Sequence, residues 1–434
     1  MLTLRDLRGT AVDANAVLPR SAQDVSATAE AVLPILDQVR TGGASAVEHL
    51  SQTFDGVTPP SLRVPHDALD RALAELDPDV RDALDMLILR TREVHSAQLP
   101  PGSLVSPGPD AQITNRWVPV QRVGLYVPGG QAVYPSSVVM NVVPAQVAGV
   151  ASLAIASPPQ KEFGGYPHPT ILAAAALLGV TEVYAVGGAQ AVGAFAYGVR
   201  DDEGALLCPP VSLITGPGNI YVATAKRAVQ GLVGIDAEAG PTEIMILADQ
   251  HANPELVAAD LISQAEHDAL AAAVLVTDSP ELAEAVLRHV EAQAADTHHA
   301  ARVKEALTGS QSAVLLVDSM EIGAEIANAY GAEHLEILTD DDDALAEQIS
   351  NAGAIFLGPY TPVSLGDYCA GSNHVLPTGG ASAYSSGLNV TSFLRSQQVI
   401  QYGRKGLDQV AGHVTALAQA EGLPAHGDAV TVRF

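Results

Sequence analysis

The sequence predicts an α/β fold, with two α/β/α domains and a small helical C-terminal tail. From about residue 118, short β-branched apolar runs alternate with helical stretches. The loops between them are short and often contain glycine, which is typical of parallel sheets covered by helices on both faces. The chain has 434 residues, 47% of them hydrophobic, more than one compact core usually holds. We therefore expect two main domains.

The elements follow one another in three groups. Residues 22–97 carry apolar side chains at helical spacing, with charges between them. A first strand–helix series fills residues 126–241, and a second fills residues 242–388. We expect the N-terminal helices to join the second series, so that residues 23–125 and 242–388 form the main α/β domain. Residues 1–22 are expected to be an N-terminal extension.

The alternation ends before the C-terminal tail, residues 389–434. The stretch FLRSQQVIQYGRKGLDQVAGHVTALAQAEG is predicted to be helical, and VTVRF is predicted to be a short strand-like end. A tail of about 45 residues cannot easily bury a core alone. It is expected to pack on its own body or on a partner subunit.

Composition narrows the possible partners. The net charge of −27, from 49 acidic and 22 basic residues, repels phosphate backbones and anionic lipids, so neither nucleic acid nor membrane is expected as a partner. Two cysteines do not indicate a disulfide framework. The N-terminus has no apolar run like that of a signal peptide, and no apolar stretch is long enough to span a bilayer. A soluble cytoplasmic protein is expected.

Two glycine-containing loops are candidates for binding a dinucleotide phosphate. GPGNIY at 216–221 and GGAQAVG at 187–193 each follow a predicted strand and open a helix, the right context for a phosphate at a helix N-terminus. Neither matches the G-x-G-x-x-G spacing. The alternative is that these glycines only make tight strand-to-helix turns.

Two polar pairs could carry chemistry. Gln264 and His267 lie three residues apart in a predicted helix and share a face, which suits either a metal ligand pair or an exposed polar surface. Glu333 and His334 are adjacent, just before a predicted strand. A carboxylate beside an imidazole supplies a water activator and a proton acceptor. The alternative for this pair is a surface turn.

The remaining candidates come late in the chain. Asp367 and His374 lie in a long glycine-containing loop, and such loops are often functional. Glu421 and His426 lie close to the C-terminus, where an exposed side chain is the ordinary outcome. Cys369, near Asp367, could be a nucleophile or ligand, but a small filler is favoured because no base is evident beside it.

Taken together, these segments resemble the histidinol dehydrogenase family over essentially the whole chain. The resemblance is carried, in family order, by VGLYVPGG and YPSSVVMN, VGGAQAVGAFAYG, GPGN and YVATAKR, IDAEAGPTE, LISQAEHD, AEHLEI, GDYCAGSNHVLPT and AEGLPAHGDAVTVRF. It implies zinc-dependent oxidation of L-histidinol to L-histidine through L-histidinaldehyde with two NAD⁺, the last steps of histidine biosynthesis. It also implies two Rossmann-like halves, as in aldehyde dehydrogenases, with residues 126–241 binding NAD⁺.

The same resemblance implies specific roles. One Zn²⁺ per subunit would be held by Gln264, His267, Asp367 and His426. His334 would be the base and Glu333 would activate water. The implied substrate contacts are Thr242, Gln264, His267, Glu333, His334, Asp367, His374, Glu421 and His426. The implied NAD⁺ contacts are Tyr126, Gln190 and Asn219.

The resemblance also implies a homodimer whose C-terminal tail reaches the neighbouring site, which would place Glu421 and His426 in trans. Many family members carry serine at the position of Thr242; the hydroxyl is kept, so its contact is expected to survive. Two alternatives to the dehydrogenase remain. One is a zinc hydrolase in which Glu333 activates metal-bound water, and the other is an acidic α/β scaffold that binds small molecules without turnover.

Overall fold

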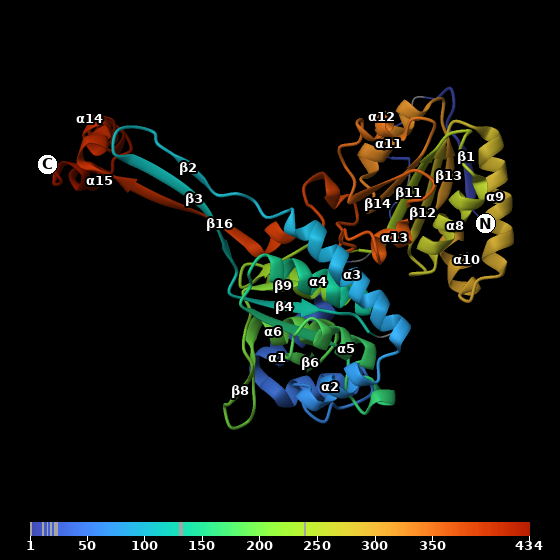
Figure 1. The fold of residues 1–434 in the computed structure, drawn as a ribbon, viewed down its shortest axis with the longest axis horizontal. Coiled ribbons are helices and arrows are strands. Elements are labelled where there is room, and N and C mark those ends of the chain that lie inside the picture. Colours follow the sequence, from blue (N-terminus) through green and yellow to red (C-terminus); the bar gives the residue numbers. More distant parts are fainter. Residues whose placement is uncertain are drawn as a thin grey trace.

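A computed structural model describes residues 2–10, 13–14, 16–17, 20, 25–129, 133–237 and 240–434 of the chain. These residues form two neighbouring α/β units and a long arm that projects away from both (Figure 1). No helix among them is both long and apolar enough to cross a bilayer. The two α/β units confirm the predicted fold class.

The first unit is built on five parallel strands in the order β10-β9-β4-β5-β6. The strands are β4 (Arg122–Tyr126), β5 (Ser152–Ser157), β6 (Val183–Ala185), β9 (Leu213–Thr215) and β10 (Gly234–Ile235). One face is covered by α2 (His66–Ala74), α3 (Pro78–Ser96), α4 (Pro135–Val147) and α5 (Pro169–Leu177). The other face is covered by α1 (Val25–Phe54), α6 (Gly188–Tyr197) and α7 (Ile220–Val229). A small hairpin, β7 (Val199–Arg200) with β8 (Leu206–Cys208), extends from this unit.

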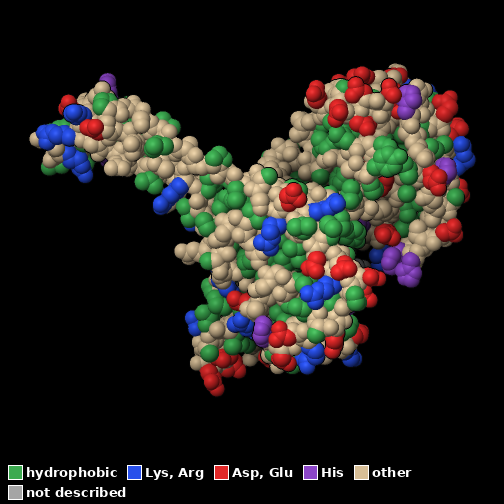
Figure 2. Space-filling model, in the orientation of Figure 1, with side chains coloured by type: hydrophobic (Ala, Val, Ile, Leu, Met, Phe, Trp, Pro, Cys, Tyr) green, Lys and Arg blue, Asp and Glu red, His purple; other side chains and the backbone are tan. Residues whose placement is uncertain are grey.

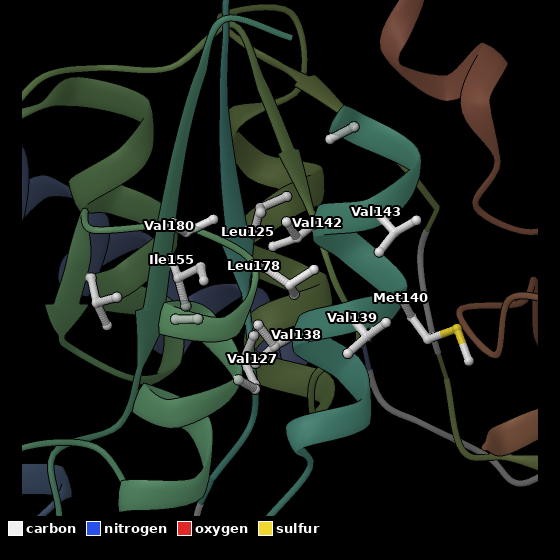
Figure 3. Close-up of a cluster of buried hydrophobic side chains, with 14 of the residues drawn as sticks. Leu125, Val127, Val138, Val139, Met140, Val142, Val143, Ile155, Leu178 and Val180 are labelled. Carbon is white, nitrogen blue, oxygen red and sulfur yellow. The ribbon is translucent and has the colours of Figure 1, made fainter. Parts of the chain in front are cut away.

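The helix α4 is buried on nearly all sides, which explains its continuous apolar sequence. Figure 3 shows Val138 and Val142 of this helix beside Leu125 of β4 and Val127, which follows that strand. The one buried amide in its middle, Asn141, donates to the carbonyl of Ser137 and accepts the hydroxyl of Thr215 at 2.8 Å. This packing fixes the start of α4, which faces the second unit.

The second unit is built on six parallel strands in the order β1-β13-β12-β11-β14-β15. The strands are β1 (Thr3–Asp6), β11 (Glu243–Ala248), β12 (Ala272–Thr277), β13 (Ala313–Leu316), β14 (His334–Leu338) and β15 (Ala354–Leu357). One face packs against α8 (Pro254–Ala265), α9 (Pro280–Ala295), α10 (Ala300–Thr308) and α13 (Val363–Asp367). The other face packs against α11 (Met320–Tyr330) and α12 (Asp342–Ala346).

The prediction that the N-terminal helices join the second series was wrong. Helix α1 packs on α6 and α7, α2 on α5, and α3 on α4, so all three cover the five-stranded sheet. The N-terminal extension contributes instead to the other unit, because β1 pairs with β13 at the edge of the six-stranded sheet. Apolar periodicity shows that a helix has a face to bury, but it does not identify the sheet that buries it.

The arm consists of residues 103–119 and 394–434 and contains β2 (Ser103–Val105), β3 (Ala111–Pro119), β16 (Leu394–Tyr402), α14 (Arg404–Ala420) and α15 (Pro424–Thr431). The prediction of a helix from Phe393 onward was wrong for β16, which pairs antiparallel with β3 along nine residues. The predicted strand VTVRF was also wrong, because α15 runs to Thr431. Pairing with a strand far away in sequence overrides the local helical pattern.

Candidate active site

A pocket of about 410 Å³ lies between the two units. It sits at the carboxyl ends of the five-stranded sheet, since Pro128 follows β4 and Pro217 follows β9. It also sits at the amino ends of the six-stranded sheet, since Thr242 precedes β11 and Glu333 precedes β14. The other sequence-predicted residues that line it are Asn219, His267, His334, Asp367 and His374.

Glu333 is the most strongly held carboxylate in the pocket wall. Its Oε2 accepts the Thr242 hydroxyl at 2.5 Å and the backbone N–H of Glu243 at 3.0 Å. Burial raises the pKa of Glu333 to about 7, although the hydrogen bond from Thr242 counteracts this shift. A carboxyl with such a pKa can exchange a proton near neutral pH.

His334 begins β14 and is only 4% exposed. Its Nδ1 lies 3.2 Å from the carbonyl oxygen of Glu243, which can only accept a hydrogen bond. This places the proton on Nδ1 and leaves Nε2 as a free acceptor. Burial lowers the pKa of His334, so the ring is neutral at pH 7 and can take up a proton.

Two predicted metal ligands face each other in the pocket. His267 Nε2 and Asp367 Oδ2 are 4.0 Å apart, and their side chains are 38% and 19% exposed. Two tetrahedral zinc ligands are separated by about 3.5 Å, so a small movement would let both bind one ion. Helix α8 ends at Ala265, so His267 lies in the turn after the helix that carries Gln264. The buried Gln264 donates to the Thr242 hydroxyl, which thereby joins it to Glu333.

The described residues of one chain do not assemble a complete metal centre. Within the described ranges, no group of three His, Cys, Asp or Glu side chains converges. His426 is the fourth predicted metal ligand, and Glu421 is a predicted substrate contact. Both are exposed, and the end of the arm that carries them, around α15, lies far from this chain's own pocket (Figure 1). A histidine, a carboxylate and an amide lie near one another, and these are ligand types that zinc accepts. Among the described residues of one chain, the fourth ligand is missing from this group.

His374 lines the same pocket as the acid–imidazole pair. Its Nδ1 donates to the carbonyl oxygen of Asp367 at 3.1 Å, so its Nε2 accepts the hydroxyl of Ser137 at 3.0 Å. Ser137 was not singled out from the sequence, although it lies in the quoted segment YPSSVVMN. The only available signal was its place at the start of a helix after a strand.

A second contact missed from the sequence lies behind Glu333. Arg20 pairs with the buried Glu243 at 2.7 Å and stacks over the ring of Tyr330 at 4.2 Å. Burial raises the pKa of Glu243, and the charge of Arg20 opposes that shift. No sequence pattern could have connected these residues, because they are 223 positions apart.

The three predicted NAD⁺ contacts are placed unequally. Asn219 lines the pocket and caps α7 by accepting the backbone N–H of Tyr221 at 3.1 Å. Tyr126 and Gln190 are only 4% and 2% exposed and do not line the pocket. The Tyr126 hydroxyl instead accepts the backbone N–H of Gly188, at the start of α6, at 3.2 Å. All three lie at the carboxyl edge of the five-stranded sheet.

The two cysteines are not placed for catalysis. Cys208 is buried, and burial raises the pKa of its thiol to about 12. Cys369 is partly exposed but does not line the pocket. The acid–imidazole pair is therefore the best-placed proton-transfer group.

This arrangement defines the class of protein: an α/β enzyme with a proton-transfer pair in a pocket between two units. The family model for histidinol dehydrogenase matches residues 18–434, and the chain belongs to that family. The histidinol dehydrogenase of Nocardia farcinica is 61% identical over 99% of this chain and 97% of its own length. That of Mycobacterium tuberculosis strain H37Rv is 59% identical over 100% of this chain and 98% of its own length.

A solved structure agrees with this assignment. The crystal structure of histidinol dehydrogenase from Elizabethkingia anophelis has a TM-score of 0.92 to this chain at 31% identity. It covers 100% of this chain and 98% of its own chain. The similarity thus includes both α/β units and the arm.

Proposed function

We propose that this protein is a zinc-dependent histidinol dehydrogenase that converts L-histidinol to L-histidine through L-histidinaldehyde, with reduction of two NAD⁺. This reaction would complete histidine biosynthesis. The observation that carries the proposal is the convergence of Glu333 and His334 with His267 and Asp367 around one pocket between the units. Membership of the family indicates the substrate, and the pocket contains the side chains that the proposed reaction needs.

The first oxidation requires a neutral base. An alcohol can release a hydride only as its hydroxyl proton leaves, and NAD⁺ accepts the hydride. His334 is suited to accept the proton, because burial lowers its pKa and its Nε2 is left free by the contact of Nδ1 with Glu243. The products of this step are the aldehyde, NADH and a protonated His334.

The second oxidation requires water. An aldehyde must first become its hydrate, which then loses a hydride to NAD⁺ and a proton to a base to give the carboxylic acid. This acid ionises to the carboxylate by losing a second proton. Glu333 is suited to remove a proton from the attacking water, because burial raises its pKa to about 7. The Thr242 hydroxyl and the Glu243 N–H hold its Oε2 in place. The two hydride transfers account for two NAD⁺.

The metal ligands would be three residues of this chain, from two segments, and one residue of its partner. His267, Asp367 and Gln264 would hold the zinc ion from the body, and His426 of a second copy would complete the set. When bound, zinc orients and polarises the amino alcohol. His374, fixed by Ser137 and the Asp367 carbonyl, lines the same pocket and is proposed to contact the substrate.

The cofactor would lie against the five-stranded unit. The loop before α7 approaches the backbone of Tyr126 so closely that Gly216, at φ +118°, has no room for a side chain. Such a close backbone turn at a helix N-terminus suits a diphosphate. Asn219 faces the pocket directly, whereas contact with Tyr126 and Gln190 would require this edge to open.

The arm supports a homodimer in which each copy completes the other's site. It exposes large apolar side chains along its length, including Leu104, Ile400, Leu417 and Val432, which suits a surface buried by another chain. The arm carries slightly more basic than acidic residues, whereas acidic side chains are spread over both α/β units (Figure 2). This contrast in charge favours docking of the arm on the body of a second copy.

The decisive experiment measures NADH formation from L-histidinol and NAD⁺ with the purified protein, before and after chelation and again after adding zinc back. We expect activity that is lost on chelation and restored by zinc, with two NADH formed per histidinol. Zinc-dependent hydrolysis of an ester or amide without NADH formation would favour the hydrolase alternative. Absence of bound metal and of turnover would contradict the proposal.

Arm exchange is tested with two inactive chains. A Glu421→Ala chain carries a defective arm, and a His334→Ala chain carries a defective body. Mixed dimers should regain up to about half of the activity of a wild-type dimer, because one of their two sites combines an intact arm with an intact body. If verified heterodimers remain inactive, the arm does not complete its neighbour's site.

A further inference from the structure

Two carboxyl side chains outside the pocket are buried against each other in the core of the six-stranded unit. Asp260 of α8 is 8% exposed and Glu336 of β14 is 2% exposed. Phe356 and Val363 belong to the apolar core between this sheet and α8. Neither carboxyl takes part in an ion pair within the described part of the chain. The proposed reaction uses neither group.

The two groups are within hydrogen-bonding reach of each other. Two neighbouring carboxylates without a cation cannot both be ionised in an apolar core, so they retain a proton. Burial and the charge of Asp260 raise the pKa of Glu336 to about 9, and burial raises that of Asp260 to about 6. At neutral pH, therefore, the pair keeps one proton, which the two carboxyl groups share in a hydrogen bond.

Asp260 accepts a second hydrogen bond, from the backbone N–H of Val363 in α13. The pair therefore joins three elements, namely α8, β14 and α13. A hydrogen bond between a carboxylic acid and a carboxylate is short and strong, and its direction is defined. An apolar contact has no preferred direction, whereas a hydrogen bond restricts the directions in which the two side chains can meet.

Each of these three elements carries residues of the proposed active site. Asp260 precedes Gln264 by one helical turn, so both lie on one face of α8. Glu336 lies two residues after His334, on the same face of β14. Val363 begins the short helix that ends at Asp367. The pair is thus a common anchor for segments that are distant in sequence.

We propose that the Asp260–Glu336 pair is a positioning device that sets the distances between the metal ligands and the base of the active site. It rests on the proposed function, since it concerns the same site. The ligands come from α8 and α13, the base comes from β14, and the junction fixes these three elements relative to one another. Burying two carboxyl groups costs stability, which two apolar side chains would not. We infer that this cost is offset in function, because the pair holds α8, β14 and α13 in defined positions relative to one another.

The test uses three variants of the full-length protein. Glu336→Gln keeps a donor toward Asp260 and is the matched control. Glu336→Leu removes the donor and leaves the Asp260 charge buried and uncompensated. Asp260→Leu/Glu336→Leu removes both polar groups and restores an apolar core, since leucine has the branched shape of aspartate. Thermal unfolding, zinc affinity by chelator competition, and kcat and KM for L-histidinol are measured for each.

Glu336→Gln should stay within about 3-fold of the wild type in zinc affinity and kcat. Glu336→Leu should unfold at a lower temperature and bind zinc about 10- to 100-fold more weakly. The double variant decides the matter. It should recover the unfolding temperature but remain about 10-fold or more impaired in zinc affinity and kcat, because the elements are packed but no longer fixed.

A double variant that regains zinc affinity and kcat together with its unfolding temperature would overturn the inference, since the pair would then serve packing alone. A loss in Glu336→Gln as large as in Glu336→Leu would also overturn it. If Glu336→Leu does not fold, the double variant still gives the answer, because it contains no buried charge. A wild type that binds no zinc would instead overturn the proposed function, and this separates the two failures.

Discussion

The two walls of the pocket differ in their chemistry. The wall from the six-stranded unit and the loop after it carries almost all of the titratable groups: His267, Asp268, Glu333, His334, Asp367, Tyr368 and His374. The wall from the five-stranded unit is formed by Pro128, Ser136, Ser137, Pro217, Gly218, Asn219 and Ile220, with Tyr134 as its one titratable group among the described residues. The wall from the six-stranded unit can transfer protons and hold a cation. The wall from the five-stranded unit consists mainly of turns and the first residues of helices.

This difference follows from which edge of each sheet faces the pocket. The five-stranded sheet presents its carboxyl edge, where the helix N-termini of α4, α6 and α7 favour an anionic ligand. The six-stranded sheet presents its amino edge, where strands begin with side chains such as Glu333 and His334. The two units share a parallel α/β architecture, yet they contribute different functions to one site. The fold alone would not have shown this.

The largest expected effect comes from removing a ligand in the titratable wall. His267→Asn should abolish zinc binding and lower turnover by about 1,000-fold or more, because the ion loses a nitrogen donor that faces Asp367. Metal content and NADH formation measure this. His66→Asn is the matched control, since that side chain is exposed on α2. Full activity in zinc-free His267→Asn protein would remove the proposed role of this wall.

A smaller loss of activity, confined mainly to one half-reaction, is expected when the carboxyl group of Glu333 is replaced. Glu333→Gln should slow the oxidation of supplied L-histidinaldehyde by about 100-fold, but alcohol oxidation much less, because only the aldehyde step needs an activated water. The amide still accepts the Thr242 hydroxyl, so the local structure is kept. Glu347→Gln on the surface serves as the control. Equal losses in both half-reactions would contradict the assigned role.

The wall from the five-stranded unit is tested through binding of the cofactor. Gly216→Ala should raise the KM for NAD⁺ by about 10-fold, since a Cβ at this position collides with the backbone carbonyl of Tyr126 and displaces the loop before α7. Gly231→Ala is a close control, because its φ of +100° is similarly unfavourable but no atom lies within 4 Å. A change in zinc affinity rather than in KM for NAD⁺ would show that the two walls are not separate in function.

The smallest effect concerns the carboxyl pair beneath the titratable wall. The folded state keeps Glu336 protonated up to a pKa of about 9, above its usual value of 4.5, so it holds a proton that the unfolded chain has released. The stability due to this group is therefore complete below pH 4.5 and is lost as the pH rises through 9. Between pH 7 and 10 the unfolding temperature should fall more steeply in the wild type than in Glu336→Gln.

The control for this pH dependence is the exposed Glu347→Gln variant, which should follow the wild type because it does not alter the buried pair. The difference in slope should amount to a few degrees over this range, the size expected for about 1 to 2 kcal/mol in a chain of this size. Identical slopes in all three proteins would mean that the pair does not retain its proton in the folded state.

The sequence alone determined the elements that have a strong local pattern. The runs that became β4, β5, β6 and β9, and later β11 to β15, are short apolar stretches between helices, and their parallel pairing follows from the connecting helices. The Glu333–His334 pair was visible because its members are adjacent. The other predicted site residues depended on family resemblance, since no spacing joins positions as distant as 264 and 426.

Only the tertiary structure decided which elements meet. It placed the N-terminal helices on the five-stranded unit, made β16 a strand by pairing it with β3, and brought Asp260 to Glu336 and Ser137 to His374. Periodicity describes what one segment must bury, but a pairing or a buried contact is a property of two segments. Their energies depend on a partner that the local sequence does not contain.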